Sequence, residues 1–535
     1  MKFSFTVFTL LFTLCVVYTS GGEPAYVLPA DRLVEWRPGV EGGIPDYPVR
    51  MVIPAEGLPS GDDSNAAPAI QKAIDSVRTP GVIVLPAGTF RLTDGILMRS
   101  GVVLRGQGLD QTILIFNAPR LGRDPGTWGR AAISFDGEWA GEEIEVLAGY
   151  DAGSRTLTLE TTDGLRVGQM VRVNADTDLE EVYGTSSYGD HVIEDWKQAG
   201  RTYARRTVRQ IVRIVEIDGN VVTVDVPLRL SRMHLNPRLR AMDTIRGAGL
   251  EALHVRRLDT THGSGIIRFS QAENCWVRDC ETYMANNNHI HLGGGRFITI
   301  ESNYIHDAHN FSGSHAYGVV GGSDSLIWNN VFRRLRHAML TSNGANGNVW
   351  AYNFSHEQDQ DGRHRLRDIS VHGHYPYMEL FEGNVAEFAT SSDWWGAAGP
   401  LITFFRNRFD TTLNHKPGGW NAPLQILNGS HRQNVVGNSM VSGQGIEVRD
   451  SEDVLVEGNL VQGEIVWNDA DPKTSKLPAS LFLDGPPHFW GDTPWPAIGA
   501  DVDAAHSPDY IRIPAQRWAE RIHAEGRSIP FAQSR

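Results

Sequence analysis

The chain has 535 residues, of which 41% are hydrophobic, 21% charged and 9% aromatic, so it can bury a large core. This balance excludes a disordered, collagen-like or coiled-coil protein. The formal charge is −14, from 49 Lys and Arg against 63 Asp and Glu. A net-acidic protein repels polyanions at long range, which argues against nucleic acid and anionic membranes as partners.

The first residues have the pattern of an export signal. Lys2 precedes an apolar run over residues 3–18, and small residues follow up to Gly22. The run is too short to cross a bilayer, and no later apolar run is long enough to do so. We therefore expect a signal peptide over residues 1–21, a secreted or periplasmic protein without a membrane span, and an N-terminal extension over residues 22–60.

Residues 61–137 have the pattern of a helix followed by short strands. Apolar residues recur at helical spacing over residues 66–77, with Ile70 and Ile74 four apart, and a β-prone run follows over residues 81–90. We expect the helix to cover the open end of a solenoid core and the strands to form its first coils.

Residues 138–231 predict a small antiparallel β domain inserted in the solenoid. Apolar and polar residues alternate over residues 156–159, 170–173 and 221–226, and Asp-Gly pairs separate the segments. The insert also contains five clustered arginines. They either line a solvated surface or contact an anionic substrate: Arg201, Arg205, Arg206, Arg209 and Arg213.

An asparagine recurs at a fixed offset from a short β-prone run in seven segments. Successive gaps are 27, 23, 31, 23, 31 and 21 residues, for Asn303, Asn330, Asn353, Asn384, Asn407, Asn438 and Asn459. This spacing suits one coil of a parallel β-helix, in which stacked amides hydrogen-bond along a ladder. We assign the β-helix core to residues 232–470 and a C-terminal tail or cap to residues 471–535.

The segments GDDSNAAPAIQKAIDS, from Gly61, and GVIVLPAGTF, from Gly81, resemble the opening of the pectate-lyase-like, right-handed parallel β-helix superfamily. The resemblance implies an all-β fold, a right-handed parallel β-helix with an N-terminal capping helix. It is specific for the fold but not for the reaction, because the superfamily includes lyases, hydrolases, epimerases and non-catalytic binding proteins.

Histidine is concentrated in the predicted core, where 14 of the 19 lie between His254 and His431. Equivalent positions of successive coils stack about 4.8 Å apart, so register predicts adjacency. Aligning the apolar pair Ala338 and Leu340 with Ile369 and Val371 places His337 beside Asp368. We interpret the four resulting neighbours as a general base, its orienting carboxylate and two cations that bind a substrate carboxylate: His337, Asp368, Arg336 and Arg367.

Further side chains of these coils are candidates for substrate binding: His289, His291, His315, His372, Trp394 and Lys416. His289 and His291 are two apart on a strand and could instead ligate a metal, although we assign no metal site. We predict no definite cofactor. Ca²⁺ remains possible at the acidic turn of Glu357, Asp359 and Asp361.

The arginines and histidines favour a secreted enzyme that cleaves an anionic polysaccharide by β-elimination at a uronic acid residue, since that reaction needs a base and a neutralised carboxylate. A glycoside hydrolase is the main alternative and requires two paired carboxyl groups. Its candidates are Asp307, Asp368, Glu382 and Asp393. A glycan-binding solenoid without catalytic activity is the third possibility. The sequence gives no prediction of oligomeric state.

Overall fold

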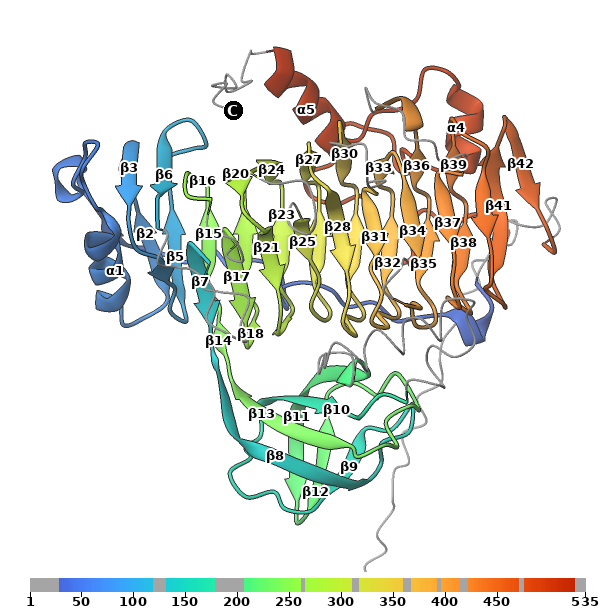
Figure 1. The fold of residues 1–535 in the computed structure, drawn as a ribbon, viewed down its shortest axis with the longest axis horizontal. Coiled ribbons are helices and arrows are strands. Elements are labelled where there is room, and N and C mark those ends of the chain that lie inside the picture. Colours follow the sequence, from blue (N-terminus) through green and yellow to red (C-terminus); the bar gives the residue numbers. More distant parts are fainter. Residues whose placement is uncertain are drawn as a thin grey trace, which may run out of the picture.

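The computed structural model describes residues 28–118, 131–178, 206–260, 265–309, 317–358, 367–391, 396–413, 422–470 and 476–524. Strands dominate this part of the chain (Figure 1). Its α-helices are α1 (Ala67–Ser76), α4 (Ala500–His506) and α5 (Pro514–Ala524), and none is long and apolar enough to cross a membrane. The expected all-β class is confirmed.

One face of the solenoid is a parallel sheet of ten strands, called here the ten-stranded sheet. Its strands follow in chain order, one from each coil: β4 (Ile96–Leu97), β7 (Ile133–Asp136), β17 (Ile267–Ser270), β21 (Asn288–Leu292), β25 (Tyr317–Val320), β28 (His337–Thr341), β31 (Ile369–Val371), β34 (Ala389–Ser391), β37 (Leu424–Ile426) and β40 (Ile446–Val448).

The other two faces form one 23-stranded sheet, because each coil contributes two strands joined by a corner. The first strand of each coil belongs to the series β1 (Val49–Val52), β2 (Gly81–Val84), β5 (Val102–Arg105), β15 (Gly249–Glu251), β19 (Trp276–Arg278), β23 (Thr299–Glu301), β26 (Leu326–Trp328), β29 (Val349–Ala351), β32 (Leu380–Glu382), β35 (Thr403–Phe405), β38 (Asn434–Val436) and β41 (Leu455–Val461). The second belongs to β3 (Gly88–Leu92), β6 (Thr112–Phe116), β16 (His254–Arg257), β20 (Glu281–Ala285), β24 (Tyr304–Ala308), β27 (Val331–Arg333), β30 (Phe354–His356), β33 (Val385–Ala386), β36 (Arg408–Phe409) and β39 (Ser439–Met440).

Short strands complete the sheets at the corners and at the C-terminal end. β14 (Ile245–Arg246), β18 (Ala272–Glu273) and β22 (Gly295–Arg296) pair in parallel at one corner, and β42 (Glu464–Trp467) pairs antiparallel to β41.

The asparagine ladder forms as the repeat predicts. At the corner between the two strand series, Oδ1 of Asn330 accepts hydrogen bonds of 2.9 Å from the backbone N–H and the Nδ2 of Asn303. Asn330 donates in the same way to Asn353, with both distances 3.0 Å. These side chains have no solvent exposure. Because each buried amide finds partners in the neighbouring coil, the ladder fixes the stacking of the coils without leaving unpaired polar atoms.

Apolar side chains fill the interior along the whole solenoid. The rings of Phe135 and Phe269 stack with centroids 4.4 Å apart, and Phe381 stacks on Phe404 at 5.2 Å. At the N-terminal end α1 buries Ile70 and Ile74 completely, as its helical spacing predicts. The predicted capping helix is therefore confirmed.

The insert is a closed antiparallel barrel whose strands neighbour in the order β10, β11, β12, β9, β8 and β13. Their bounds are β8 (Glu138–Ala148), β9 (Thr156–Leu159), β10 (Met170–Asn174), β11 (Arg209–Asp218), β12 (Val221–Val224) and β13 (Arg238–Asp243). The barrel lies beneath the solenoid and joins it through β8 and β13 (Figure 1). The last strand reaches residue 243, beyond the residue 231 at which the sequence analysis placed the end of the insert.

Buried ion pairs fix the barrel to the turns that follow strands of the ten-stranded sheet. Arg229 donates to Asp324 in the turn after β25. Arg296 donates from the solenoid to both Asp324, at 2.7 Å, and Asp225 of the barrel, at 2.8 Å. Because Arg296 and Asp324 are almost fully buried, these pairs hold the barrel in one orientation.

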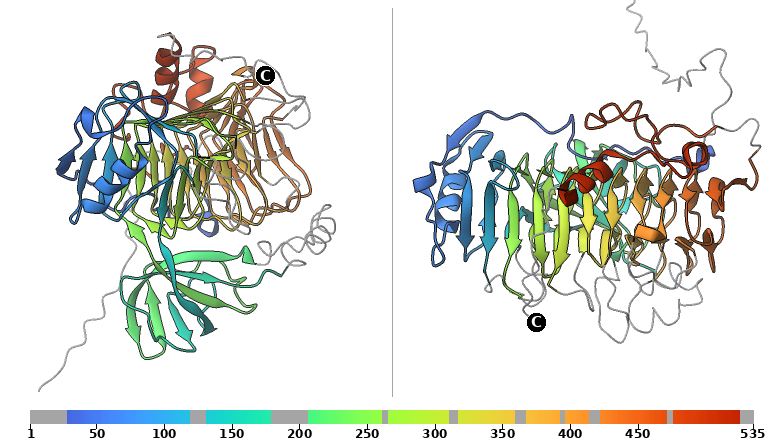
Figure 2. Two further views of the ribbon diagram at one scale, coloured as in Figure 1. Left: turned by 60° about the vertical axis from the view of Figure 1, so that its left-hand side comes forward. Right: turned by 90° about the horizontal axis from the view of Figure 1, so that it is seen from above.

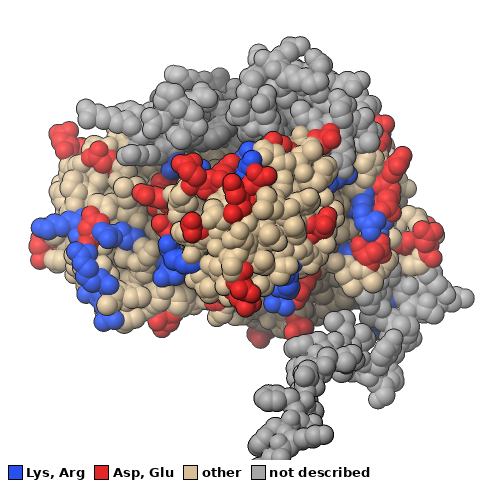
Figure 3. Space-filling view, turned by 90° about the horizontal axis from the view of Figure 1, so that it is seen from below, with Lys and Arg blue, Asp and Glu red and all other residues tan. Residues whose placement is uncertain are grey.

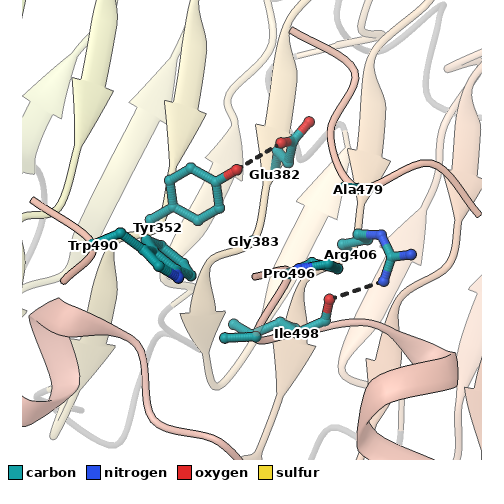
Figure 4. A pocket seen from close by; sticks show the side chains of 9 residues that line it. Tyr352, Glu382, Gly383, Arg406, Ala479, Trp490, Pro496 and Ile498 are labelled. Atoms are coloured by element: carbon teal, nitrogen blue, oxygen red, sulfur yellow. Dashed lines mark hydrogen bonds between the residues drawn. The ribbon is translucent and has the colours of Figure 1, made fainter. Parts of the chain in front are cut away.

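The C-terminal segment crosses the outside of the 23-stranded sheet, with α5 lying along it (Figure 2). Arg408 of β36 pairs with Asp503 of α4, and Arg406 pairs with Asp501. A small cavity lies beneath this segment, lined by Tyr352, Glu382, Gly383, Arg406, Ala479, Trp490, Pro496, Ala497 and Ile498 (Figure 4).

Candidate active site

The strand register of the ten-stranded sheet differs from the alignment made on the sequence. Met339 is level with Ile369, so His337 stands level with Arg367, and Ala338 with Asp368. The prediction that His337 and Asp368 share a column is wrong by one residue. Ala338 and Met339 of β28 are both fully buried, and an apolar pair therefore fits either register.

Asp368 lies in the buried corner before β31 instead of beside His337. It accepts a hydrogen bond from Oγ of Ser355 and from the backbone N–H groups of Glu387 and Phe388, at 3.1 and 2.9 Å. Burial raises its pKa to about 6, against the opposing effect of these donors. This carboxyl group therefore anchors the start of β31, the strand that follows Arg367.

His337 is held by the backbone of the next coil. Its Nδ1 lies 3.0 Å from the carbonyl oxygen of Arg367. Because a carbonyl only accepts, Nδ1 carries the proton, and in the neutral ring Nε2 has the lone pair. Burial lowers the pKa of His337 well below its ordinary value, assisted by the positive charges of His372 and Arg336. The imidazole is therefore neutral near pH 7, the form that a general base needs.

Three other predicted residues lie around this ring. The ring of His372 is 5.9 Å from that of His337 between centroids. Arg336 precedes His337 in the chain, the Arg367 carbonyl contacts its ring, and the charges of both arginines lower the His337 pKa. In the described part of the chain, Nε and Nη1 of Arg336 are buried without a hydrogen-bond partner. Such donors are costly to bury unless they bind an acceptor, and a substrate carboxylate is one.

His289 and His291 lie in different surroundings and do not form a metal-binding pair. Nδ1 of His289 lies 2.9 Å from Oγ1 of Thr282 and its Nε2 lies 3.0 Å from the carbonyl oxygen of Asp307, so both ring nitrogens have protein partners. Burial lowers the pKa of His289 to about 3 and that of His291 to about 4. The positive charges of Arg268 and Arg209 lower the His291 pKa further.

The sequence analysis did not name the hydroxyl groups of the same sheet. Ser370 and Thr390 stand level with His291 in the register, and their hydroxyl oxygens are buried without a hydrogen-bond partner among the described residues. The sequence does indicate that the Ser370 side chain points away from the core, since Ser370 lies between the inward Ile369 and Val371. Placing it level with His291 required the strand register, which the sequence did not determine.

Several predicted residues lie outside the described ranges. These are the substrate-binding candidates His315, Trp394 and Lys416, the calcium candidates Asp359 and Asp361, the carboxyl candidate Asp393, and the insert residues Arg201 and Arg205.

The described carboxyl groups proposed for hydrolysis stand on different parts of the solenoid. Asp307 is the next-to-last residue of β24, and its Oδ2 lies 2.8 Å from Nδ1 of His306. Glu382 belongs to β32 beneath the C-terminal segment and accepts hydrogen bonds from the Tyr352 hydroxyl at 3.0 Å and the Leu481 N–H at 2.9 Å (Figure 4). With Asp368 in its corner, these three do not provide the paired carboxyl groups that hydrolysis needs.

The insert's arginines separate into paired and unpaired groups. Arg206 binds Glu143 and Asp176, and Arg213 binds Glu41. Arg209 donates to the carbonyl oxygen of Asn343, and no described carboxylate pairs with it. On the face of the molecule that carries the barrel, acidic and basic side chains are interspersed (Figure 3). Arg209 is thus the described arginine of this group that bonds a main-chain carbonyl and no described carboxylate.

A second group of titratable residues, which the sequence analysis did not identify, lies on the second strand series of the 23-stranded sheet. His306 contacts Glu281 at 3.1 Å and Asp307 at 2.8 Å, so both ring nitrogens face carboxylates. Nδ1 of His254 lies 3.6 Å from the same Glu281 oxygen. Burial lowers the pKa of His306, but the hydrogen bonds that its ring donates to Asp307 and Glu281 raise it by more. We interpret His306 as a cation that neutralises buried carboxylates.

Residues 55–187 match the family model described as "Rhamnogalacturonase A/epimerase, pectate lyase-like". No curated protein matches the chain. Among solved structures, the chain is similar to the tailspike gp61 of Pseudomonas phage phi297, with 13% identity and a TM-score of 0.52 over 74% of this chain and 63% of that one. It is also similar to the tailspike gp49 of Pseudomonas phage LKA1, with 14% identity and a TM-score of 0.48 over 73% of this chain and 74% of that one.

The chain spans less than two thirds of the length of the phi297 tailspike, and at such identity the likeness concerns the fold. The parallel coils, the asparagine corner and the family match at the N-terminal coils agree with one another. The chain thus adopts a right-handed parallel β-helix fold, as the resemblance in its sequence predicted, and residues 55–187 match a pectate-lyase-like family model.

Proposed function

We propose that this protein is a secreted or periplasmic carbohydrate-active enzyme that cleaves an anionic polysaccharide by β-elimination at a uronic acid residue. The observation that carries the proposal is the imidazole of His337, whose Nδ1 is held by the main-chain carbonyl of Arg367 and whose neighbour in the chain is Arg336. The description of the matching family, which names a rhamnogalacturonase, supports a pectin-like substrate.

In the proposed reaction each group has one step. Arg336 and Arg367 bind the uronate carboxylate and neutralise its charge, which makes the proton on C5 more acidic. Nε2 of His337 takes that proton, and the electrons of the C5–H bond form the C4–C5 double bond while the C4–O4 bond breaks. The departing oxygen takes a proton from the imidazolium or from water. Asp368 contributes by anchoring β31, and the Arg367 carbonyl replaces it as the group that orients the base.

Hydrolysis is the second candidate, because the family description names a hydrolase. It would need two carboxyl groups at a suitable separation, and Asp393, one of the predicted candidates, lies outside the described ranges. Non-catalytic glycan binding is the third candidate and would use the same face of the sheet.

The test is a panel of acidic polysaccharides incubated with the purified full chain. Elimination produces an unsaturated uronide, seen by its ultraviolet absorbance together with new reducing ends. New reducing ends without that absorbance would indicate hydrolysis. If neither product forms, non-catalytic glycan binding is the function that remains.

On a substrate that is cleaved, we expect His337→Gln to lower kcat by about 10²- to 10⁴-fold, the usual contribution of a general base. Glutamine keeps a polar N–H group but has no basic nitrogen, so Tm should change much less than kcat. Full turnover by this variant would remove His337 from the mechanism.

A further inference from the structure

Three side chains with metal-binding atoms meet where α5 lies against the solenoid. His356 ends β30, Glu357 follows it, and His523 lies near the end of α5. One ligand atom from each lies within 4.8 Å of the other two. The group belongs to the 23-stranded sheet and takes no part in the elimination site proposed on the ten-stranded sheet.

His356 is buried with part of its ring unsatisfied. The residue is 6% exposed, and its Nε2 has no hydrogen-bond partner in the described part of the structure. Its Nδ1 lies 3.6 Å from Oε1 of Glu357, longer than a hydrogen bond. Phe354 stacks on the ring at 4.6 Å between centroids and fixes its plane. A buried imidazole without full hydrogen bonding indicates a missing ligand or solvent molecule.

Glu357 is held so that one carboxylate oxygen remains for such a ligand. Nε of Arg333 and Nε of Arg334 both donate to Oε2, at 2.9 and 3.2 Å. Oε1 faces His356. Carboxylates that bind metals are themselves held by hydrogen bonds in this way, which orients the ligating oxygen.

His523 provides the third ligand from an exposed position on the helix, so an ion can reach the group from solvent. Its ring meets that of His356 edge to face, with centroids 5.5 Å apart.

We propose that His356, Glu357 and His523 bind a divalent transition metal of the Zn²⁺ type, which ties α5 to β30. Two imidazole nitrogens and one carboxylate oxygen form a known zinc ligand set, with water in the fourth position. Ligands about 2.0 to 2.1 Å from a tetrahedral zinc lie roughly 3.3 Å apart, so the three side chains need to move only slightly. Ca²⁺ and Mg²⁺ prefer oxygen ligands and fit this set poorly.

The alternative is that the two imidazole rings only pack against each other. Packing gives no dependence on metal, whereas an ion bound only by the folded chain raises Tm by mass action. The two interpretations therefore differ in a measurement that does not depend on enzymatic activity.

The experiment uses the full chain, stripped of metal with a chelator and then dialysed. Calorimetric titration with Zn²⁺ should show one site per chain, and saturating Zn²⁺ should raise Tm by about a few degrees. Ca²⁺ at the same concentration should do neither.

His523→Ala removes an exposed ligand and should leave the fold intact while weakening Zn²⁺ binding by at least about tenfold. His506→Ala is the matched control, because His506 is an exposed histidine of the neighbouring helix α4 that bonds only within its own helix. Absence of Zn²⁺ binding by the wild type, equal binding by the His523 and His506 variants, or equal response to Ca²⁺ would each overturn the proposal.

Discussion

At the scale of single residues, the elimination site depends on which group orients His337. The sequence predicts that His337, Arg336, Arg367 and His372 lie in one region. In the structure the His372 ring is 5.9 Å from that of His337 between centroids, and Nδ1 of His337 lies 3.0 Å from the Arg367 carbonyl oxygen. The sequence could not place Asp368 correctly, because a shift of the strand register by one residue at a buried corner leaves the apolar pattern almost unchanged. In solenoids the neighbours of a side chain depend on register, and register depends on three-dimensional packing in addition to local pattern.

Asp368→Ala distinguishes the two roles of this carboxyl group. The structure predicts a loss of about 1 to 3 kcal/mol in unfolding free energy, because Ser355 and two backbone N–H groups lose their buried acceptor. Chemical denaturation measures this loss. Turnover measured well below the lowered Tm should fall much less than in His337→Gln. A variant with normal stability and a kcat as low as that of His337→Gln would restore Asp368 as the orienting partner.

Glu382 predicts a pH dependence of stability. Burial raises its pKa from 4.5 to about 7, so the folded chain holds a proton that the unfolded chain releases. The contribution of protonated Glu382 to the free energy of unfolding is fully present below pH 4.5. It is lost as pH rises towards 7, by an amount of the order of 3 kcal/mol. Glu382→Gln cannot titrate, so a plot of Tm against pH should be flatter for the variant in this window. Parallel plots for variant and wild type would contradict the assignment.

At the scale of elements, most of the fold could be predicted from the sequence. The seven asparagines mark one corner in each coil, and Ile70 and Ile74 mark the capping helix, because both signals are local and repeat or follow a helical period. The course of the C-terminal segment could not be predicted. Its contacts, such as Arg408 with Asp503 and Arg406 with Asp501, join residues far apart in the chain and follow no period.

Asn353→Ala tests the ladder. Oδ1 of Asn353 accepts from the backbone and the side chain of Asn330, and its Nδ2 donates to the Ile327 carbonyl and to Asn384. Removing a fully buried amide leaves these partners unsatisfied, and we expect a loss of about 1 to 3 kcal/mol with a lower Tm. Asn220→Ala, at an exposed turn of the barrel, is the control. An unchanged melt for Asn353→Ala would mean that water replaces the amide.

At the scale of the whole molecule, the barrel acts as a fixed part of the solenoid. Its ion pairs with the turns are buried, and Tyr375 and Tyr377 of the solenoid belong to the same apolar cluster as the barrel interior. These turns lie at the ends of the strands that carry the proposed site. We infer that the barrel contributes to substrate binding through Arg209, which donates to the Asn343 carbonyl in the turn after β28.

Arg209→Gln tests that contribution. Arg209 is a cation desolvated by burial, without a carboxylate among the described residues, so an acidic substrate should gain a charge-assisted hydrogen bond from it. Such bonds contribute about 1.5 to 3 kcal/mol, which corresponds to a rise in KM of roughly 10- to 100-fold. The effect on kcat should be smaller, because the carboxylate is charged before and during the reaction. Arg206→Gln is the matched control, since Glu143 and Asp176 already neutralise that barrel arginine. If both variants raise KM equally, or neither does, the barrel only supports the fold, and the substrate is bound by the β-helix alone.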